Sequence, residues 1–122
     1  MNDDLRKQHM ERITDPMAER CYDRLCAACD SRPEGMSDQD QMLVCDIATM
    51  EQMKQQLYDD IRVRGVVEDW HNGRQRMKRE NKSIQSARML MEQQRKHLNE
   101  LRLTPGSKKA AQIPVNDEFD EF

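Results

Sequence analysis

Apolar residues recur at helical spacing in three stretches of the chain, and a short stretch of alternating residues separates the second from the third. The first helix is predicted to begin at Asp15-Pro16. Aspartate accepts from the free amides of a first helical turn, and proline at that position loses no hydrogen bond. Its predicted apolar face consists of Met17, Cys21, Leu25 and Ala28. The segment from Ser31 to Gly35 contains Pro33 and ends the helix.

The second helix is predicted to begin at Ser37, with Asp40 in the position of a capping-box partner. Gly65 is predicted to end it, because glycine takes the left-handed cap conformation without steric cost. Its apolar surface is broad and consists of Leu43, Ile47, Met50, Leu57 and Ile61, widened by Met42, Val44, Cys45, Ala48 and Met53. A surface wider than one stripe predicts contacts on two sides, with a helix of the same chain and with a neighbouring subunit.

Residues 66–79 predict a β-hairpin with a two-residue turn at Asn72-Gly73, a favoured pair for such turns. This turn pairs Asp69 with Arg76 and Glu68 with Met77. It places Val66, Glu68 and Trp70 on one face with Gln75, Met77 and Arg79, and Val67, Asp69 and His71 on the other with Arg74, Arg76 and Lys78. The single tryptophan, Trp70, is the expected anchor of a hairpin that would be marginal alone.

The third helix is predicted from about Lys82 to Leu101 and ends at Thr104-Pro105-Gly106. Ile84, Met91 and Leu98 are spaced seven apart, with Ala87, Gln94 and Leu101 at the companion positions. Gln94 interrupts this apolar series. We expect its side chain to be exposed, although a buried glutamine could set the register of the helix.

These elements predict a mainly α protein with three principal helices and a short β-hairpin between the second and third. With 122 residues the chain is long enough for one small domain. The expected organisation is a flexible, frayed or weakly helical arm at 1–13, a helical domain at 14–109, and an acidic disordered tail at 110–122. Aromatic residues make up only 4 % of the chain and methionines number ten, which predicts a thin core and favours self-association.

The net charge of −3 is unevenly distributed. Residues 1–61 hold seven Lys and Arg against fourteen Asp and Glu, whereas residues 62–109 hold thirteen against five. The last 13 residues hold four acidic and no basic side chains. A strongly basic segment indicates a phosphate-bearing partner. The alternative is that it matches the acidic first half of the chain.

Little in the sequence indicates catalysis or metal binding. Cys26 and Cys29 form a Cys-x-x-Cys motif, but a zinc site needs a second pair or nearby histidines, and a predicted helix favours packing of both thiols. The His71-Asn72 pair is accounted for by the turn. We therefore expect no enzyme activity, no catalytic residue, no metal and no cofactor.

No window approaches the run of about eighteen apolar residues that a membrane span needs, and the N-terminus lacks the apolar region of a signal peptide. The sequence thus predicts a cytosolic protein with reduced cysteines and no membrane partner.

The second half of the chain resembles the small subunit of phage terminases. The resemblance depends on an ordered series: Gly65, Gly73 of the hairpin, Asn81-Lys82, the helix from Ile84 to Leu101, and the ending Leu103-Thr104-Pro105-Gly106-Ser107-Lys108. Two positions depart from the family pattern. Lys82 stands where the family usually has proline, and Arg102 where it often has glycine.

The resemblance implies a ring-forming homo-oligomer in the host cytoplasm. Such proteins recognise double-stranded viral DNA where packaging starts and regulate the large subunit, which holds the ATPase and nuclease. The expected subunit contacts are Met50, Met53, Leu57, Met91 and Leu98. The acidic tail, Asp117, Glu118, Phe119, Asp120, Glu121 and Phe122, is the expected contact with the large subunit.

The DNA-binding candidates come from charge alone and are Arg74, Arg76, Lys78, Arg79, Lys82, Lys108 and Lys109. Another placement uses the first two predicted helices as a helix-turn-helix, although that region is acidic. Two other functions stay open at this point: a dimeric nucleic-acid-binding regulator, and a scaffold or interaction protein that does not bind nucleic acid.

Overall fold

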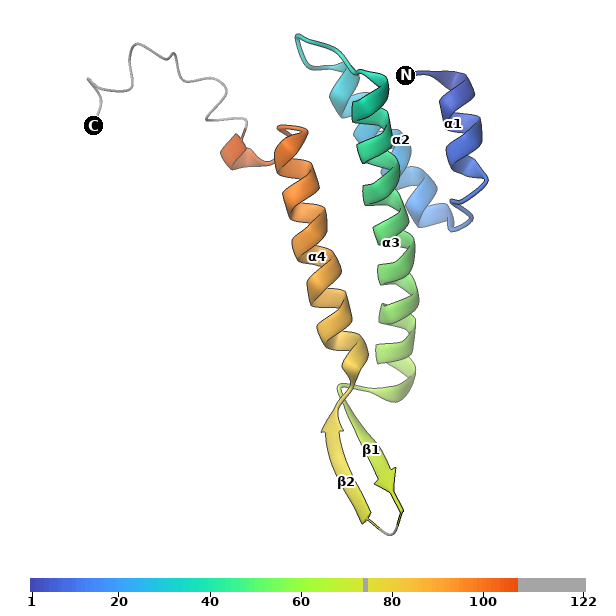
Figure 1. The fold of residues 1–122 in the computed structure, drawn as a ribbon, viewed down its shortest axis with the longest axis vertical. Helices are drawn as coiled ribbons and strands as arrows, with labels where there is room; N and C mark the ends of the chain where they lie inside the picture. Colours follow the sequence, from blue (N-terminus) through green and yellow to red (C-terminus); the bar gives the residue numbers. More distant parts are fainter. Residues whose placement is uncertain (74, 108–122) are drawn as a thin grey trace, which may run out of the picture.

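The computed structural model describes residues 1–73 and 75–107, and within them the chain forms four helices and one two-stranded antiparallel sheet (Figure 1). In chain order the elements are α1 (Asp3–Met10), α2 (Pro16–Asp30), α3 (Asp38–Arg64), β1 (Val67–Asn72), β2 (Gln75–Glu80) and α4 (Lys82–Glu100). The three principal helices predicted correspond to α2, α3 and α4. The mainly helical fold with a hairpin between the last two is confirmed.

Local capping signals set the starts of α2 and α3 as predicted. The carboxylate of Asp15 accepts a 2.7 Å hydrogen bond from the amide of Met17, and Pro16 is the first residue of α2. Ser37 and Asp40 form a capping box in which each side chain accepts from the other residue's amide. These bonds satisfy amides that have no partner inside the helix.

The ends of α3 and α4 both involve left-handed backbone. Gly65 has φ of 83°, and its amide donates a 2.7 Å hydrogen bond to the carbonyl of Ile61, which ends α3 at the predicted glycine. Arg102 follows the C-cap of α4 with φ of 57°, and it is the one residue other than glycine with positive φ among those described. A side chain is strained in this conformation, and this is the position where the resembled family often has glycine.

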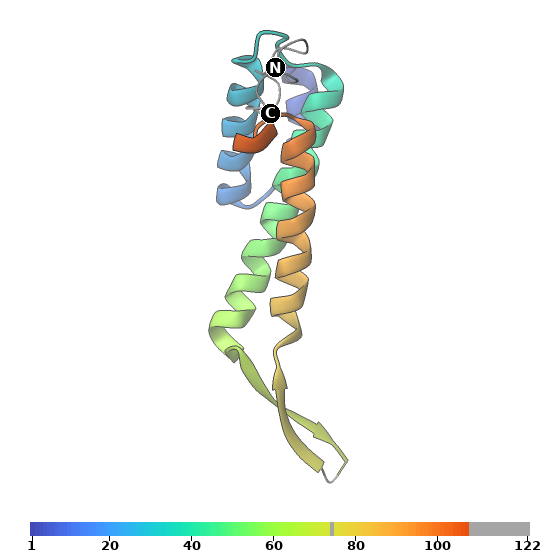
Figure 2. The ribbon, with the colours of Figure 1, turned by 90° about the vertical axis from the view of Figure 1, so that its left-hand side faces the viewer.

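The long helix α3 is the spine of the molecule (Figures 1 and 2). Helix α2 packs against the N-terminal half of α3, and α4 runs antiparallel along α3. The hairpin β1–β2 extends beyond the far end of the α3–α4 pair, and the N-terminus lies at the opposite end. The hairpin is therefore held by its base.

The hydrophobic core lies where α2, α3 and the end of α4 meet. It consists of Ile13, Ala18, Tyr22, Cys26, Cys29, Val44, Cys45, Ile47, Ala48 and Leu101. The buried face of α2 is therefore turned by one residue from the predicted face, since Met17 is 48 % exposed and Cys21 and Leu25 are half-buried. Tyr22 is fully buried on this face and its hydroxyl is hydrogen-bonded to His9 and Gln41, which turns the face of Tyr22 toward the core in place of the face of Met17.

The first ten residues differ from the frayed or weakly helical arm expected. They form α1, with Asn2 as its N-cap, and a buried polar network connects α1 to the other helices. The hydroxyl of Tyr22 lies 2.7 Å from Nδ1 of His9 and accepts from the side-chain amide of Gln41 at 2.9 Å. Gln41 also exchanges hydrogen bonds of 2.9 Å with the backbone of Asn2. The sequence did not reveal these contacts, because the segment itself is polar and charged and its partners lie far away in the sequence.

Gln94 is buried, so the expectation of an exposed side chain is wrong. It is 7 % exposed, and its amide nitrogen donates to the carbonyl of Ile47 at 3.1 Å and to the carboxylate of Glu51 at 3.3 Å. Both acceptors lie on α3. A polar residue in the α3–α4 contact is thus satisfied by the neighbouring helix, which favours one register of the two helices.

Candidate nucleic-acid interface

The hairpin forms a narrow ribbon that no helix covers in the part of the chain that the structure describes (Figures 1 and 2). A two-stranded ribbon of this kind fits the major groove of DNA. The described side chains of β2 are exposed except for Arg79, which is half-buried. The side chain of Trp70, the predicted anchor, lies outside what the structure describes.

The cross-strand pairs differ from those predicted, although the faces do not. Asp69 is opposite Lys78 and Glu68 is opposite Arg79, so the turn falls one residue later, after Asn72. Gly73, with φ of 62°, takes the first position of this turn. Each partner has moved by two residues, which keeps the described side chains on the predicted faces.

The observed register contains an ion pair that the predicted register lacks. Arg79 donates a 3.0 Å hydrogen bond from Nε to the carboxylate of Glu68 directly across the ribbon. In the predicted register Glu68 would face Met77. Directly opposed charges stabilise a strand pair, and here they outweigh the turn preference of Asn-Gly.

One face of the ribbon carries the exposed cations. Arg76 lies opposite His71 and Lys78 lies opposite Asp69, and all four side chains are exposed. Lys82 is exposed as well, at the first position of α4. The structure therefore brings Arg76 and Lys78 onto one face, with Lys82 beyond the end of β2. Arg74, Lys108 and Lys109 lie outside the described residues.

A polar network, which we call the clasp, attaches the base of the ribbon to both helices. Its centre is Asn81, which is fully buried. The amide of Asn81 donates to the carbonyl of Val66 at 2.8 Å, and its side chain donates to the carbonyl of Gly65 at 3.1 Å. The same side chain accepts from the amide of Ser83 at 3.0 Å and caps α4. One residue thus closes the hairpin and starts the next helix.

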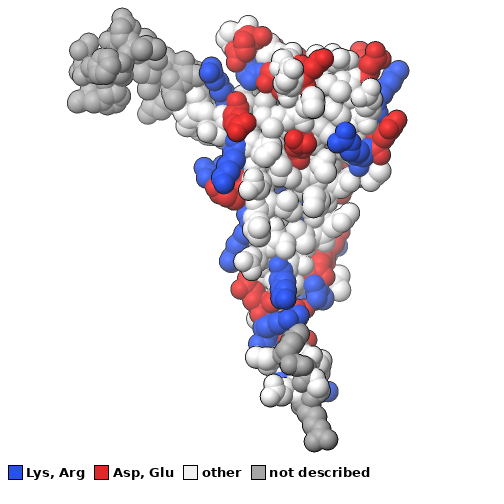
Figure 3. All heavy atoms as spheres, viewed as in Figure 1, with Lys and Arg blue, Asp and Glu red and all other residues white. Residues whose placement is uncertain are grey.

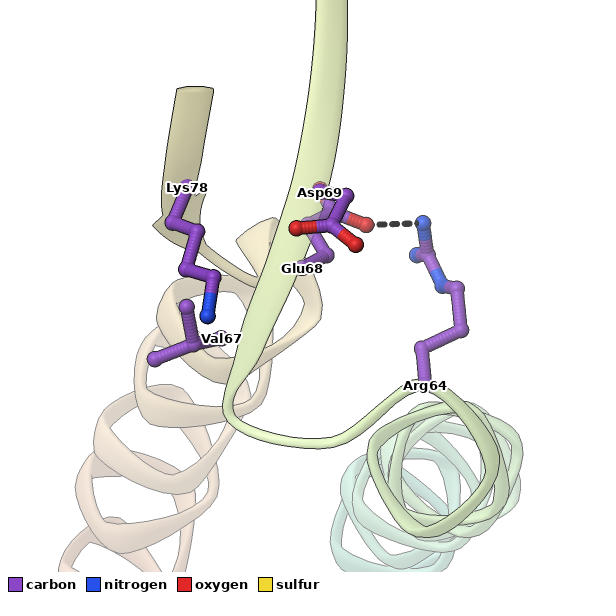
Figure 4. A pocket seen from close by; sticks show the side chains of 5 residues that line it. All are labelled: Arg64, Val67, Glu68, Asp69 and Lys78. Atoms are coloured by element: carbon purple, nitrogen blue, oxygen red, sulfur yellow. Dashed lines mark hydrogen bonds and ion pairs between the residues drawn. The ribbon is translucent and has the colours of Figure 1, made fainter. Parts of the chain in front are cut away.

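Charged groups complete the clasp. Asp60 at the end of α3 accepts two hydrogen bonds from Arg64, at 2.6 and 2.7 Å, and one from the hydroxyl of Ser83 at 2.6 Å. These bonds hold the pKa of Asp60 far below its ordinary value, with Arg64 the largest cause. Arg64 also reaches Glu68 on β1 at 2.6 Å (Figure 4). Because Glu68 in turn binds Arg79, the clasp connects α3, both strands and α4.

The clasp distinguishes among the candidate DNA contacts. Arg79 is paired with Glu68 and belongs to the clasp, whereas the exposed side chain of Lys78 extends from β2 toward Val67 of β1 (Figure 4). Lys and Arg side chains follow the α4 edge and gather at the base of the ribbon, with Asp and Glu among them (Figure 3). Charge composition identified the basic segment, but it did not show which cations are already paired.

Two of the five predicted subunit contacts lie in one groove. Met53 and Leu57 line an apolar groove of about 460 Å³ between α3 and α4, together with Met89 and Leu90. Met53 is 49 % and Met89 64 % exposed. Met89 and Leu90 were missed because they lie outside the seven-residue repeat of α4. The available signal was the run Met89-Leu90-Met91, since three consecutive apolar residues widen the apolar face of a helix beyond a seven-residue repeat.

The other predicted subunit contacts lie outside this groove. Met91 is 43 % exposed and sits about 160° around α4 from Met89. Leu98 packs against the hydrophobic core, and Met50 is half-buried. Whether subunits meet at these residues stays a prediction. The tail residues proposed to bind a large subunit lie outside the described residues.

The cysteines are part of the packing. Cys26 and Cys29 are 2 % and 0 % exposed within the core, as expected of thiols on a packed helix. Burial raises the pKa of Cys26 to about 12, so its thiol is protonated at neutral pH. In residues 1–73 and 75–107 no group of His, Cys, Asp and Glu has the arrangement of a metal site. None of the helices described is both long and apolar enough to span a membrane.

Comparison with known proteins identifies one family. A family model described as "Phage terminase, small subunit" matches residues 18–118, which include all of α2 except its first two residues, and α3, the ribbon and α4. No curated protein and no solved structure matches the chain.

Proposed function

This chain belongs to the family of phage terminase small subunits, and we propose that it binds viral DNA where packaging starts, as a ring oligomer, and regulates the large subunit. Membership of the family supports a role in phage genome packaging. The match over residues 18–118 is the observation that carries the proposal. The partners would be double-stranded viral DNA, the large subunit and further copies of the chain, in the host cytoplasm.

The ribbon is the proposed DNA contact. Arg76 and Lys78 are exposed on one face of a projecting hairpin, and Lys82 lies next to its base. Acidic side chains on the same ribbon, such as Asp69, limit the attraction of a single copy to phosphate. A ring would present many ribbons to one DNA molecule. Weak contacts would then add to give binding that is strong and sensitive to salt.

The chain would perform no catalysis, because small subunits of this family are generally regulatory and DNA-binding proteins. ATP hydrolysis and DNA cleavage would belong to the large subunit. The acidic tail, Asp117 to Phe122, would be the contact with that subunit. Its alternation of carboxylates and phenylalanines suits a basic, apolar partner surface.

The first test is the mass of the protein in solution, measured by light scattering after gel filtration. We expect one discrete assembly, because a repeated heterologous contact that closes into a ring gives a fixed number of copies. The family likeness suggests roughly eight to twelve copies. A monomer or dimer at micromolar concentration would contradict the ring and would favour a dimeric regulator.

The second test is DNA retention at several salt concentrations. The double variant Arg76→Glu, Lys78→Glu should bind DNA at least tenfold more weakly and with a shallower dependence on salt, because phosphate contacts release counterions. Lys7→Glu, Arg24→Glu makes the same change of charge at exposed positions of α1 and α2 and should have a much smaller effect. A larger loss of DNA affinity in this control would indicate that DNA binds the N-terminal helices instead of the ribbon. Absence of binding by the unmodified protein would favour a scaffold.

A further inference from the structure

A second surface pocket, of about 680 Å³, lies where the end of α3, the base of the ribbon and the start of α4 meet. Its floor is apolar and includes Ile61, Val66 and Ile84. Its rim carries Lys78 from β2 and Arg88 from α4, both exposed. Elements on three sides therefore form a site that combines apolar surface with positive charge.

The apolar part of this pocket is open to solvent. Val66 is 60 % exposed, and Val67, which also lines the pocket, is 55 % exposed. Neighbouring apolar side chains exposed in this way are typical of a binding surface. Glu80 is the one carboxylate among the lining residues, so the charge at the rim favours an anionic ligand.

We propose that this pocket binds the C-terminal segment Asp117–Phe122 of the same chain. The segment reads Asp-Glu-Phe-Asp-Glu-Phe, with four carboxylates and two phenylalanines. The phenyl rings of Phe119 and Phe122 match the apolar floor, and the carboxylates beside them match Lys78 and Arg88. An acidic peptide without aromatic residues would leave the floor uncovered.

The connecting chain is long enough. Phe119 lies twelve positions after Ser107, and twelve steps of ~3.3 Å reach about 40 Å when extended. The pocket lies near the start of α4 and Ser107 follows its end, so the distance along the helix from Leu101 back to Ile84 is about 26 Å. The segment therefore reaches the pocket of its own subunit with slack.

Binding of the segment would cover Lys78, a proposed DNA contact, so tail and DNA would compete for the ribbon. This consequence rests on the proposed function, whereas binding of the tail does not. Capture of the same segment by the large subunit would release the ribbon for DNA. The tail would then couple arrival of the large subunit to DNA binding.

The direct test is photo-crosslinking of the full chain with benzoylphenylalanine in place of Phe119. The sample is an equal mixture of ¹⁴N- and ¹⁵N-labelled protein, so that mass spectrometry separates crosslinks within one chain from those between chains. The proposal predicts crosslinks within one chain to residues 61–67 and 84–88. Crosslinks spread over α1 and α2, or found mainly between chains, would overturn it.

A matched pair of variants tests the charged rim. Arg88→Glu should lower the yield of these crosslinks several-fold, because it reverses one of the cations facing the tail. Arg95→Glu makes the same change seven residues along α4, at an exposed position outside the lining, and should leave the yield unchanged. Equal effects of the two variants would contradict a site at this pocket.

A second readout keeps the net charge constant. Phe119→Ser, Phe122→Ser should increase DNA affinity several-fold by releasing the tail, whereas Ile113→Ser, Val115→Ser, which also removes two apolar side chains from the tail, should not. Unchanged affinity in the first variant would overturn the competition. If no variant binds DNA, the proposed function fails, while the crosslinks still decide whether the tail binds the pocket.

Discussion

The guanidinium of Arg32 donates a 2.9 Å hydrogen bond to the carbonyl of Leu101, 69 positions further along the chain. Arg32 follows α2, and Leu101 is the C-cap of α4. The same guanidinium donates to the carbonyl of Gly35 at 2.7 Å and to the carboxylate of Asp40 at 2.7 Å. One side chain thus joins the end of α2, the start of α3 and the end of α4.

Replacement of this arginine should destabilise the helical body. Arg32→Ala removes several charge-assisted bonds and leaves partly buried acceptors without a donor, so we expect the free energy of unfolding to fall by about 2–4 kcal/mol. Urea titration at fixed protein concentration measures it. Arg24→Ala, at an exposed position of α2, is the control and should change stability by less than about 0.5 kcal/mol. Similar losses in both variants would show that Arg32 is not the junction we describe.

Arg102 should be replaceable by glycine with a gain in stability. Its φ of 57° strains an L-residue, and relief of that strain is worth about 1 kcal/mol. Arg102→Gly should therefore raise the midpoint of thermal unfolding. Arg102→Ala removes the same charge but keeps the Cβ atom, so it should give no such gain. An equal gain from alanine would assign the effect to charge.

The clasp should control the order of the ribbon. In Asp60→Asn the charge-assisted bonds to Arg64 are lost. We expect amide hydrogen exchange in Val67–Glu80 to be faster than in the unmodified protein, with exchange in α2 unchanged. Asp59→Asn changes the neighbouring carboxylate, which pairs with exposed Arg62, and should leave exchange in the ribbon unchanged. Slow exchange in both variants would show that the clasp is dispensable.

The carboxylate of Asp60 should also make the order of the ribbon depend on pH. The pKa of Asp60 is depressed in the folded protein, so its contribution to stability is present above its ordinary pKa of 3.8 and is lost as the pH falls below that value. Intrinsic amide exchange slows in acid, so the informative quantity is the protection factor, which corrects for it. Protection in the ribbon should fall as the pH drops below 3.8, and Asp60→Asn should remove this fall.

His9 should make stability depend on pH in a higher range. Its pKa lies below the ordinary 6.5 mainly because burial opposes the charged form, with repulsion from Arg12 and partial compensation by Asp46. Protons therefore bind more readily to the unfolded chain. Stability is full above pH 6.5 and falls as the pH drops through that value.

The variant His9→Gln should abolish the decline between pH 7 and pH 5, at the cost of some stability at pH 7 through its altered contact with Tyr22. His97→Gln changes a histidine in the last turn of α4 and should keep the decline. Denaturant titrations across this pH range distinguish them. A decline that persists in His9→Gln would exclude His9 as its source.

The groove between α3 and α4 should contribute to assembly if subunits meet there. Met89 is 64 % exposed on the groove, so Met89→Lys should spare the fold of one subunit and reduce the mass measured by light scattering. Met42→Lys alters a methionine that is 55 % exposed and is not among the residues lining the groove. Loss of assembly in the Met42 variant alone would place the contact elsewhere.

The features predictable from sequence were those that neighbouring residues determine. The capping box of Ser37 and Asp40 and the end of α3 at Gly65 depend on a few adjacent residues, and each was found where predicted. The turn at Asn72-Gly73 was local too, but it was displaced because the Glu68–Arg79 pair depends on residues eleven apart.

Features that depend on distant partners were missed. Burial of Gln94 requires the carbonyl of Ile47, 47 positions away, and α1 requires Gln41 from another helix. The candidate site shows the same limit. The charge pattern located the basic segment that contains the ribbon, and the family likeness indicated its context. Only the structure separates Lys78, which is exposed, from Arg79, which belongs to the clasp.

The position of the hydrophobic core has a consequence for variants of the ribbon. None of the ribbon residues whose side chains the structure describes belongs to the core cluster, and the ribbon joins the helices through the few side chains of the clasp. Mutations along the strands therefore leave the packing of the helical body intact. A variant that keeps Asp60 and Asn81 should therefore tolerate changes in the sequence and length of the ribbon without loss of the fold.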